Sequence, residues 1–336
     1  MNGFYGYSGT VWDENFNSAM FLRKHQEQEN LKKVGFYTGL AILGTILIQN
    51  VLVVALAAFG LQDRYFDDGI FASGFDIMLS ILSLLMPFMI AGRAMNRYSS
   101  VGRVFYLGGP YRKSMMLPAV VAGVGCCMAA NIVTTYISLI FNQFGYEPSS
   151  IDFSLPEGAF GFVMSLFRVV IVAGVVEEVI MRGYTLGNLR FYGDMFAIAM
   201  SSVVFALIHG NFTQIPFALL SAFGLGYFSV KTGTLWTGVI IHIINNFVSV
   251  IFYYTEGVIE ENLNVMIQLA VIYGSVFIGF IAFAYFVSHT KDIPLMKGGS
   301  MLSSKEKLKA YFLNVPMIIS VLYLIIVSVA GITEKG

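Results

Sequence analysis

Charged residues are scarce in this 336-residue chain. Asp, Glu, Lys and Arg make up 12% of it, against about 25% of an ordinary soluble domain, whereas 57% of the residues are hydrophobic. So few charges cannot cover the surface of a water-soluble protein of this size. The apolar residues also occur in long runs of about 20, the length that a helix needs to cross a bilayer. The sequence therefore predicts an all-α, polytopic transmembrane helical bundle.

Cysteine is nearly absent, since the only two, Cys126 and Cys127, are neighbours. Adjacent cysteines form at best a strained disulfide, and neither has a partner at metal-ligand spacing. We therefore expect no disulfide framework and no cysteine metal site, and we interpret both residues as small packing residues. The pattern also shows no Pro/Ser-rich linker, no internal repeat and no cleavable signal peptide.

The apolar runs predict eight or nine spans. The division between two of them is weak, because only Asn211, Thr213 and Pro216 mark a turn there. Residues 1–34 are predicted to form an N-terminal tail and residues 35–332 the bundle. The runs are centred near residues 35–61, 69–92, 115–141, 160–188, 193–214, 215–230, 234–254, 263–287 and 313–332.

Basic and acidic residues alternate between successive loops. Lys and Arg cluster before the first run, after the second and after the eighth, whereas Asp and Glu fill the loops between. By the positive-inside rule the basic loops, and with them the N-terminus, are cytoplasmic. We expect a multi-pass protein of a bacterial plasma membrane, in contact with membrane lipids. The basic residues determine topology and predict no nucleic-acid partner.

A few ionisable residues lie inside the apolar runs, where burial is costly and each is a candidate functional residue. They are Glu177, Glu178 and Arg182 in the fourth run, His209 in the fifth and His242 in the seventh. Asp76 and Arg168 lie nearer the ends of their runs, and we expect them to reach the membrane interface.

Spacing separates the roles of the two glutamates. Glu178 and Arg182 are four residues apart, so they share a helix face and can neutralise each other. Glu177 is rotated by about 100° from Glu178, so it is expected to point into the bundle without a partner on its own helix. The alternative is structural: Arg182 would be an interfacial anchor and Glu178 its counter-ion, with His209 and Asn246 as interhelical hydrogen-bonding residues.

The motifs EEVIMR, FALIH and HIINN occur in this order on successive predicted helices. They resemble the EExxxR, FxxxH and HxxxN motifs of the CPBP family (CAAX protease and bacteriocin-processing, or Abi) of intramembrane proteases. The matching residues are Glu177, Glu178, Arg182, Phe205, His209, His242 and Asn246. The resemblance covers roughly residues 160–250, which would be the catalytic core.

The resemblance implies an endopeptidase that hydrolyses a peptide bond near the membrane by an activated water. Glu177 would be the general base assisted by His209, and His242 and Asn246 would stabilise the oxyanion. Glu178 and Arg182 would orient Glu177. The substrate would be a peptide such as a leader peptide, or the prenylated C-terminal peptide of a CAAX protein.

The sequence leaves open one alternative to the metal-free site and two alternatives to proteolysis. Glu177, His209 and His242 have the composition of a hydrolytic zinc site, although the chain lacks HExxH. The chain would otherwise be a non-cleaving bacteriocin self-immunity protein, or a proton-coupled transporter that uses the same residues. The span limits also place Glu177 and His242 at mid-membrane but His209 toward the outer end, and catalysis requires the three to meet.

Overall fold

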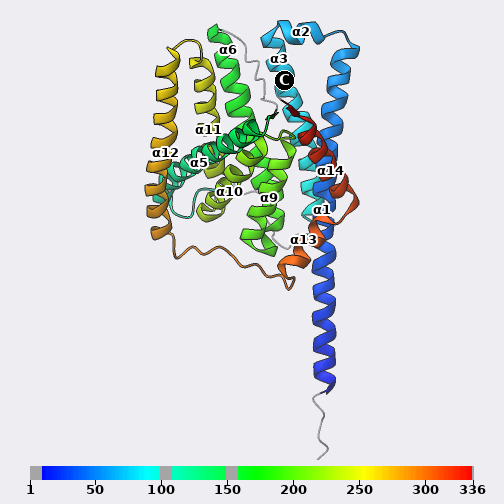
Figure 1. The fold of residues 1–336 in the computed structure, drawn as a ribbon. Coiled ribbons are helices and arrows are strands. Elements are labelled where there is room, and N and C mark those ends of the chain that lie inside the picture. Colours follow the sequence, from blue (N-terminus) through cyan, green and yellow to red (C-terminus); the bar gives the residue numbers. More distant parts are fainter. Residues whose placement is uncertain (1–9, 99–107, 149–157, 335–336) are drawn as a thin grey trace, which may run out of the picture.

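The computed structural model describes residues 10–98, 108–148 and 158–334 of the chain. These residues form a helical bundle with one short two-stranded sheet, so the predicted all-α membrane architecture is confirmed (Figure 1). The helices in chain order are α1 (Thr10–Ala58), α2 (Gln62–Asp67), α3 (Gly69–Ser80), η1 (Ile81–Leu85), α4 (Met86–Met95), η2 (Lys113–Met115), α5 (Met116–Gln143), α6 (Gly158–Ser165), η3 (Leu166–Val172), α7 (Ala173–Glu178), η4 (Val179–Leu186), α8 (Gly187–Leu189), η5 (Arg190–Tyr192), α9 (Asp194–Ile208), α10 (Gln214–Thr232), α11 (Leu235–Thr255), α12 (Glu261–His289), α13 (Ser304–Phe312) and α14 (Val315–Ala330).

Seven described helical segments are long and apolar enough to cross a membrane, and an eighth is possible if a bent pair counts as one span. The bent pair is α13 with α14, which meet at 83°. The run predicted at residues 193–214 is not a full span, because α9 has only 15 residues. At 1.5 Å per residue it is about 22 Å long, short of the roughly 30 Å of a hydrocarbon core.

Helices α9 and α10 pack against each other as a hairpin (Figure 1), in which α9 is the shorter helix. Gly210 has a φ of +58°, a left-handed conformation that suits glycine, and it turns the chain directly after α9. Helix α10 ends at a second such residue, Gly233, with a φ of +75°. The next residue, Thr234, accepts a hydrogen bond from the backbone N–H of Trp236 and so caps α11. The turn at Gly210 therefore joins the two helices of the hairpin, and α11 begins directly after the end of α10.

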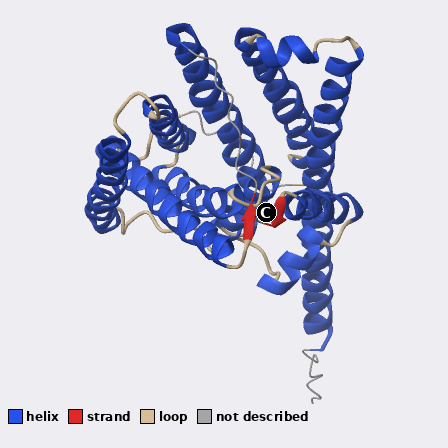
Figure 2. Ribbon diagram, turned by 45° about the horizontal axis from the view of Figure 1, so that its top comes forward, coloured by secondary structure: helices blue, strands red, loops and turns tan. Residues whose placement is uncertain are grey.

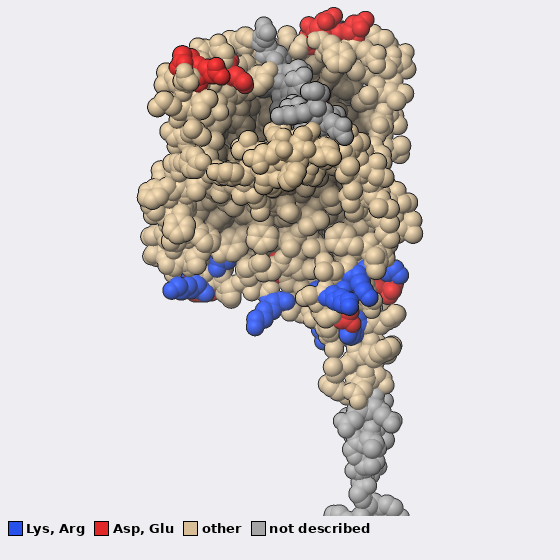
Figure 3. All heavy atoms as spheres, in the orientation of Figure 1, with Lys and Arg blue, Asp and Glu red and all other residues tan. Residues whose placement is uncertain are grey.

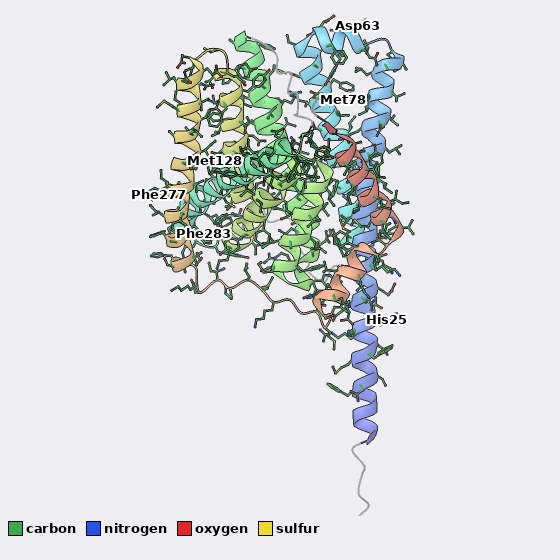
Figure 4. The ribbon with its side chains drawn as sticks, viewed as in Figure 1. His25, Asp63, Met78, Met128, Phe277 and Phe283 are labelled. Atoms are coloured by element: carbon green, nitrogen blue, oxygen red, sulfur yellow. The ribbon has the colours of Figure 1, made fainter. Side chains whose placement is uncertain are left out.

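Charge divides the molecule into two opposite faces (Figure 3). Lys and Arg side chains gather at the end that carries the 291–309 segment, which we call the basic face. Asp and Glu side chains gather at the other end, around Asp63 and Glu260, which we call the acidic face. Figure 4 places Asp63 at this second end and His25 beyond the first. The separation is the one that the loop charges predicted.

Helix α1 is continuous over 49 residues. Residues 10–34, which belong to the predicted N-terminal tail, therefore continue the helix of the first span. It projects past the basic face (Figure 1). Where α1 enters the bundle, a Cβ on Gly35 or Gly39 would collide with the backbone of Tyr311 or Met317. Glycine is thus required where α13 and α14 cross α1.

The two strands lie close to the C-terminus (Figure 2). Strand β1 (Tyr146–Pro148) follows α5, and β2 (Ile332–Glu334) follows α14. They pair antiparallel, with Tyr146 opposite Glu334. This sheet ties the end of α14 to the end of α5.

Buried apolar side chains form two clusters. One joins α1, α4, η4, α9, α13 and α14, and includes Leu31, Phe88 and Tyr311. The other joins α5, α10, α11 and α12, and includes Phe228, Ile241 and Phe286. The site residues lie on the elements between these clusters, so both cores hold them in place.

Candidate active site

The two glutamates of EEVIMR lie in a span with unusual helix geometry. Helix α7 has six residues and ends at Glu178, and it is enclosed by the π-helical segments η3 and η4. Segments of π-helix are rare and often occur at functional sites. The π-helical segments flank the two glutamates, and η4 contains Arg182.

Glu178 is completely buried, and its Oε1 accepts two hydrogen bonds. Arg182 Nη1 donates one over 2.8 Å, and His242 Nδ1 lies 2.9 Å away. Arg182 is itself 5% exposed and donates from Nη2 to the Ala222 carbonyl, 3.0 Å away. The predicted Glu178–Arg182 ion pair is therefore present. It lies in the interior, which excludes the interfacial-anchor interpretation of Arg182.

Glycine makes room for the Glu178 carboxylate. A Cβ on Gly238 would lie 2.6 Å from Glu178 Oε2 and 2.7 Å from Ser229 Oγ. No side chain larger than a hydrogen atom fits at this position of α11 unless the carboxylate moves. The glycine of TLWTGVIIH is thus part of the support for Glu178, which the sequence pattern did not reveal.

His242 joins the two glutamates. Its Nε2 lies 3.7 Å from Glu177 Oε2, while Nδ1 contacts Glu178. Because Nδ1 donates its proton to Glu178, Nε2 is an acceptor in neutral His242 and a donor only in the imidazolium form. The bond to Glu178 fixes the orientation of the ring, so Nε2 faces the Glu177 carboxylate.

His209 is oriented by its own helix. Its Nδ1 lies 2.8 Å from the Phe205 carbonyl oxygen, which can only accept, so Nδ1 carries the proton and Nε2 is free to accept one. The Phe205 ring packs against both histidines, with centroid distances of 4.6 Å to His209 and 6.1 Å to His242. The phenylalanine of FALIH therefore separates and positions the two imidazoles.

The candidate residues surround one cavity of about 640 Å³. Its wall includes Glu177, His209, His242 and Asn246, whereas Glu178 and Arg182 lie behind the wall. The sequence placed His209 toward the outer end of a full span. That placement is wrong, because α9 is short and ends within the bundle, which brings His209 to the depth of the other residues (Figure 1).

Asn246 is held by hydrogen bonds from two directions. Its Nδ2 donates to the Val169 carbonyl over 2.8 Å, and its Oδ1 accepts from Asn245 Nδ2 over 3.2 Å. Asn245 is 4% exposed and also lines the cavity, and its own Oδ1 has no partner among the described residues. The sequence did not single out Asn245, since an asparagine beside another asparagine carries no spacing signal.

The zinc alternative requires three ligands at one point. Within residues 10–98, 108–148 and 158–334, no three His, Cys, Asp or Glu side chains lie close enough to share a metal ion. Nδ1 of His242 is held by Glu178 and Nδ1 of His209 by the Phe205 carbonyl, which leaves the two Nε2 atoms as the only possible ligand atoms, as is usual for metal-bound histidines. Glu177, His209 and His242 are therefore not gathered around one point as described, and we derive no step through a metal.

Both cysteines are free, and Cys127 contributes to the cavity wall. Cys126 instead packs against α10, where a Cβ on Gly224 would lie 2.7 Å from its Sγ. Their positions agree with the interpretation as small packing residues.

Residues 159–248 match the family model described as type II CAAX prenyl endopeptidase Rce1-like. The matched segment contains all three motifs, so the resemblance to the CPBP proteases is confirmed. No curated protein and no solved structure matches the chain. The Rce1-like segment supports an intramembrane endopeptidase as the general class of this multi-pass membrane protein.

A second polar group lies in the wall of the same cavity. Arg168 Nη1, in the Rce1-like segment, forms an ion pair with Asp76 Oδ2, and Tyr65 donates to Asp76 Oδ1 over 3.0 Å. The sequence predicted that Asp76 and Arg168 would reach the membrane interface, and it gave no sign of a contact between them. They pair across helices, so each compensates the charge of the other, and both line the cavity.

Proposed function

We propose that this protein is an intramembrane endopeptidase in which Glu177 activates the water that hydrolyses a peptide bond. The observation that carries the proposal is the common cavity: Glu177, His209, His242 and Asn246 come from three helices and line the same 640 Å³ space. A structural role for each residue would not require that they face one cavity. The family match to this segment supports the same class of reaction.

In the proposed reaction a water molecule hydrogen-bonds the Glu177 carboxylate beside His242 Nε2. Glu177 takes a proton as the water oxygen attacks the carbonyl carbon of the substrate. His209 assists, since its Nε2 is an acceptor facing the cavity. The tetrahedral intermediate then loses the amine, which receives the proton from Glu177 as the C–N bond breaks.

His242 and Asn246 are proposed to stabilise the oxyanion. In its imidazolium form, His242 donates from Nε2 while Glu178 holds Nδ1. Asn246 Nδ2 has two protons, and Val169 accepts one. The second is available for the substrate oxygen.

Glu178 and Arg182 are positioning residues in this proposal. With His242 as imidazolium, two carboxylates face two cations, so the site carries no net charge at membrane depth. Charges buried without such compensation are strongly destabilising. Glu178 thus supports His242 and leaves the Glu177 carboxylate free for the reaction.

The cavity reaches toward the acidic face. Its wall includes Tyr65, two residues from Asp63, and Tyr253, three residues from Glu256. If the basic face is cytoplasmic, as we propose for a bacterial plasma membrane, the substrate approaches from the other side. This direction favours an exported or leader-type peptide over a prenylated C-terminal peptide of a cytoplasmic protein.

The test is cleavage of a panel of quenched fluorescent peptides, prenylated and unprenylated, by protein purified in detergent. Wild type is compared with E177Q, and with E261Q as a control at a glutamate on the acidic face. We expect cleavage by wild type and E261Q, with and without a zinc chelator, and none by E177Q.

The other outcomes identify the alternatives. Cleavage that disappears with chelator and returns with zinc would indicate a metalloenzyme. If the wild-type protein binds a panel peptide without cleaving it, the self-immunity function gains support. Proton-coupled flux in liposomes without cleavage would indicate a transporter.

A further inference from the structure

The cavity has two polar regions on one helical span. Glu177 belongs to the catalytic region, and Arg168 precedes it by nine residues toward the acidic face. At the α-helical rise of 1.5 Å per residue the two positions would be about 13 Å apart along the helix axis, and the π-helical segment η3 between them shortens this distance. Four residues of an extended peptide cover about 13 Å, and three residues cover about 10 Å. A peptide with its scissile bond at Glu177 therefore reaches Arg168 three or four residues further on.

Arg168 is only partly used by the protein. Its side chain is 15% exposed and lines the cavity. Among the described residues its guanidinium bonds only Asp76, through Nη1, and Nε has no partner. Nε is buried, but guanidinium carries five N–H donors in a planar fork, so the Nη donors that Asp76 leaves unused can bind a second carboxylate.

Asp76 positions the Arg168 guanidinium and does not occupy all of its hydrogen-bond donors. One of its oxygens accepts from Arg168 and the other from the Tyr65 hydroxyl. These bonds hold the guanidinium against the wall, from the neighbouring helix α3. A charged pair in the interior is costly, and replacing it with apolar residues often stabilises a protein, so its presence needs a reason.

We propose that Arg168, braced by Asp76 and Tyr65, is a carboxylate-binding subsite of the cavity. It binds a carboxylate of the substrate peptide three or four residues from the scissile bond. The source is the α-carboxylate of a short C-terminal segment, or an acidic side chain at that distance. The proposal rests on the proposed peptidase function, because it identifies the class of peptide that the same cavity accepts.

The first experiment compares three forms of a cleaved peptide that ends three residues after the scissile bond. One has a free C-terminal carboxylate, one a C-terminal amide, and one the amide with Glu as its last residue. For wild type we expect kcat/KM to be roughly 10- to 100-fold higher for the free carboxylate than for the amide, mainly through KM. If the Glu peptide recovers the loss, an acidic side chain is the ligand. If the Glu peptide does not recover the loss, the α-carboxylate is the ligand.

The variants separate recognition from folding. R168Q should cleave the acid and the amide equally, whereas R168K retains the positive charge and part of the preference. The D76N/R168Q double variant removes both charges, so it leaves no unpaired buried charge and should also show no preference. R64Q, at an exposed arginine near the acidic face, is the control and should retain the preference. Equal cleavage of acid and amide by wild type would overturn the proposal, as would an equal loss for both peptides in R168Q.

A binding measurement separates this proposal from the peptidase function. The released tripeptide, as acid and as amide, is titrated into E177Q and E177Q/R168Q. Selective binding of the acid that disappears with R168Q supports the subsite even where wild type cleaves nothing. Equal or no binding of the two forms contradicts it.

Discussion

His242 Nδ1 lies 2.9 Å from Glu178 Oε1, at a carboxylate that is fully removed from solvent. The second glutamate of EEVIMR thus contacts the histidine of another motif, 64 residues away. This bond fixes both the ring position of His242 and the nitrogen that faces the cavity. The predictions below follow from this contact and its surroundings.

E178Q is expected to reduce both stability and activity, whereas E177Q should reduce activity alone. The substitution at Glu178 leaves Arg182 without its buried counter-ion, a change that costs about 3–5 kcal/mol in similar pairs. Glu177 is 20% exposed to the cavity, and its contact with His242 Nε2, at 3.7 Å, is longer than a hydrogen bond. Thermal unfolding and peptide cleavage of both variants test the difference. Equal melting temperatures for the two would contradict the positioning role of Glu178.

G238A is expected to displace Glu178 and lower kcat by about 10- to 100-fold, since small displacements in an active site have effects of this size. The added methyl group would lie 2.6 Å from Glu178 Oε2. G274A, on α12, is the matched control, because a Cβ there has no heavy atom within 4 Å. If both variants cleave at the wild-type rate, Gly238 does not support the site.

N246A is expected to lower kcat by about 100-fold or more with little change in KM, as for the loss of an oxyanion donor. N245A should have a smaller effect, because Asn245 acts through its 3.2 Å bond to Asn246. In the N246A background, N245A should add little further loss. Independent, multiplicative effects in this double-mutant cycle would show that the two amides do not act together.

The helix ends on the acidic face are expected to loosen at low pH. Backbone N–H groups of Phe71 and Ile70 lower the pKa of Asp68, which caps α3, although slight desolvation opposes this. Those of Leu263 and Asn262 lower the pKa of Glu260, which caps α12. When folding lowers the pKa of a carboxyl group, the group stabilises the folded state at pH values above its ordinary pKa. This stabilisation is lost as the pH falls through the pKa of the folded state. The loss therefore begins below the ordinary pKa values of 3.8 for Asp and 4.5 for Glu.

Hydrogen exchange of the first turns of α3 and α12 measures this loss between pH 5 and pH 3, after correction for the intrinsic pH dependence of exchange. D68N keeps a capping oxygen that does not titrate, so protection at α3 should then be independent of pH while α12 still responds. A pH response of α3 that persists in D68N would assign the effect to other groups.

The cavity is expected to be accessible from the acidic face alone. In a background without Cys126 and Cys127, a membrane-impermeant maleimide added on that side should label Y253C, because Tyr253 lines the cavity and is 41% exposed. K305C, on the basic face, should react only from the other side. Labelling of Y253C from the basic face would place the mouth of the cavity there.

Much of the fold followed from composition and spacing. The scarcity of charge required a membrane-spanning bundle, and the loop charges predicted which ends of the helices lie together. The four-residue spacing of Glu178 and Arg182 determined their ion pair, since residues at this spacing share a helix face. These are local properties, so the sequence by itself contains them.

The tertiary structure decided what depends on contacts between distant segments. The depth of His209 depends on where α9 begins and on the turn at Gly210, and hydropathy alone does not separate a short buried helix from part of a long span. The partner of Arg168 lies 92 residues away on another span, and Asn245 and Gly238 matter only through what they touch. Spacing along one helix identifies residues on a shared face, but only packing determines which other face they meet.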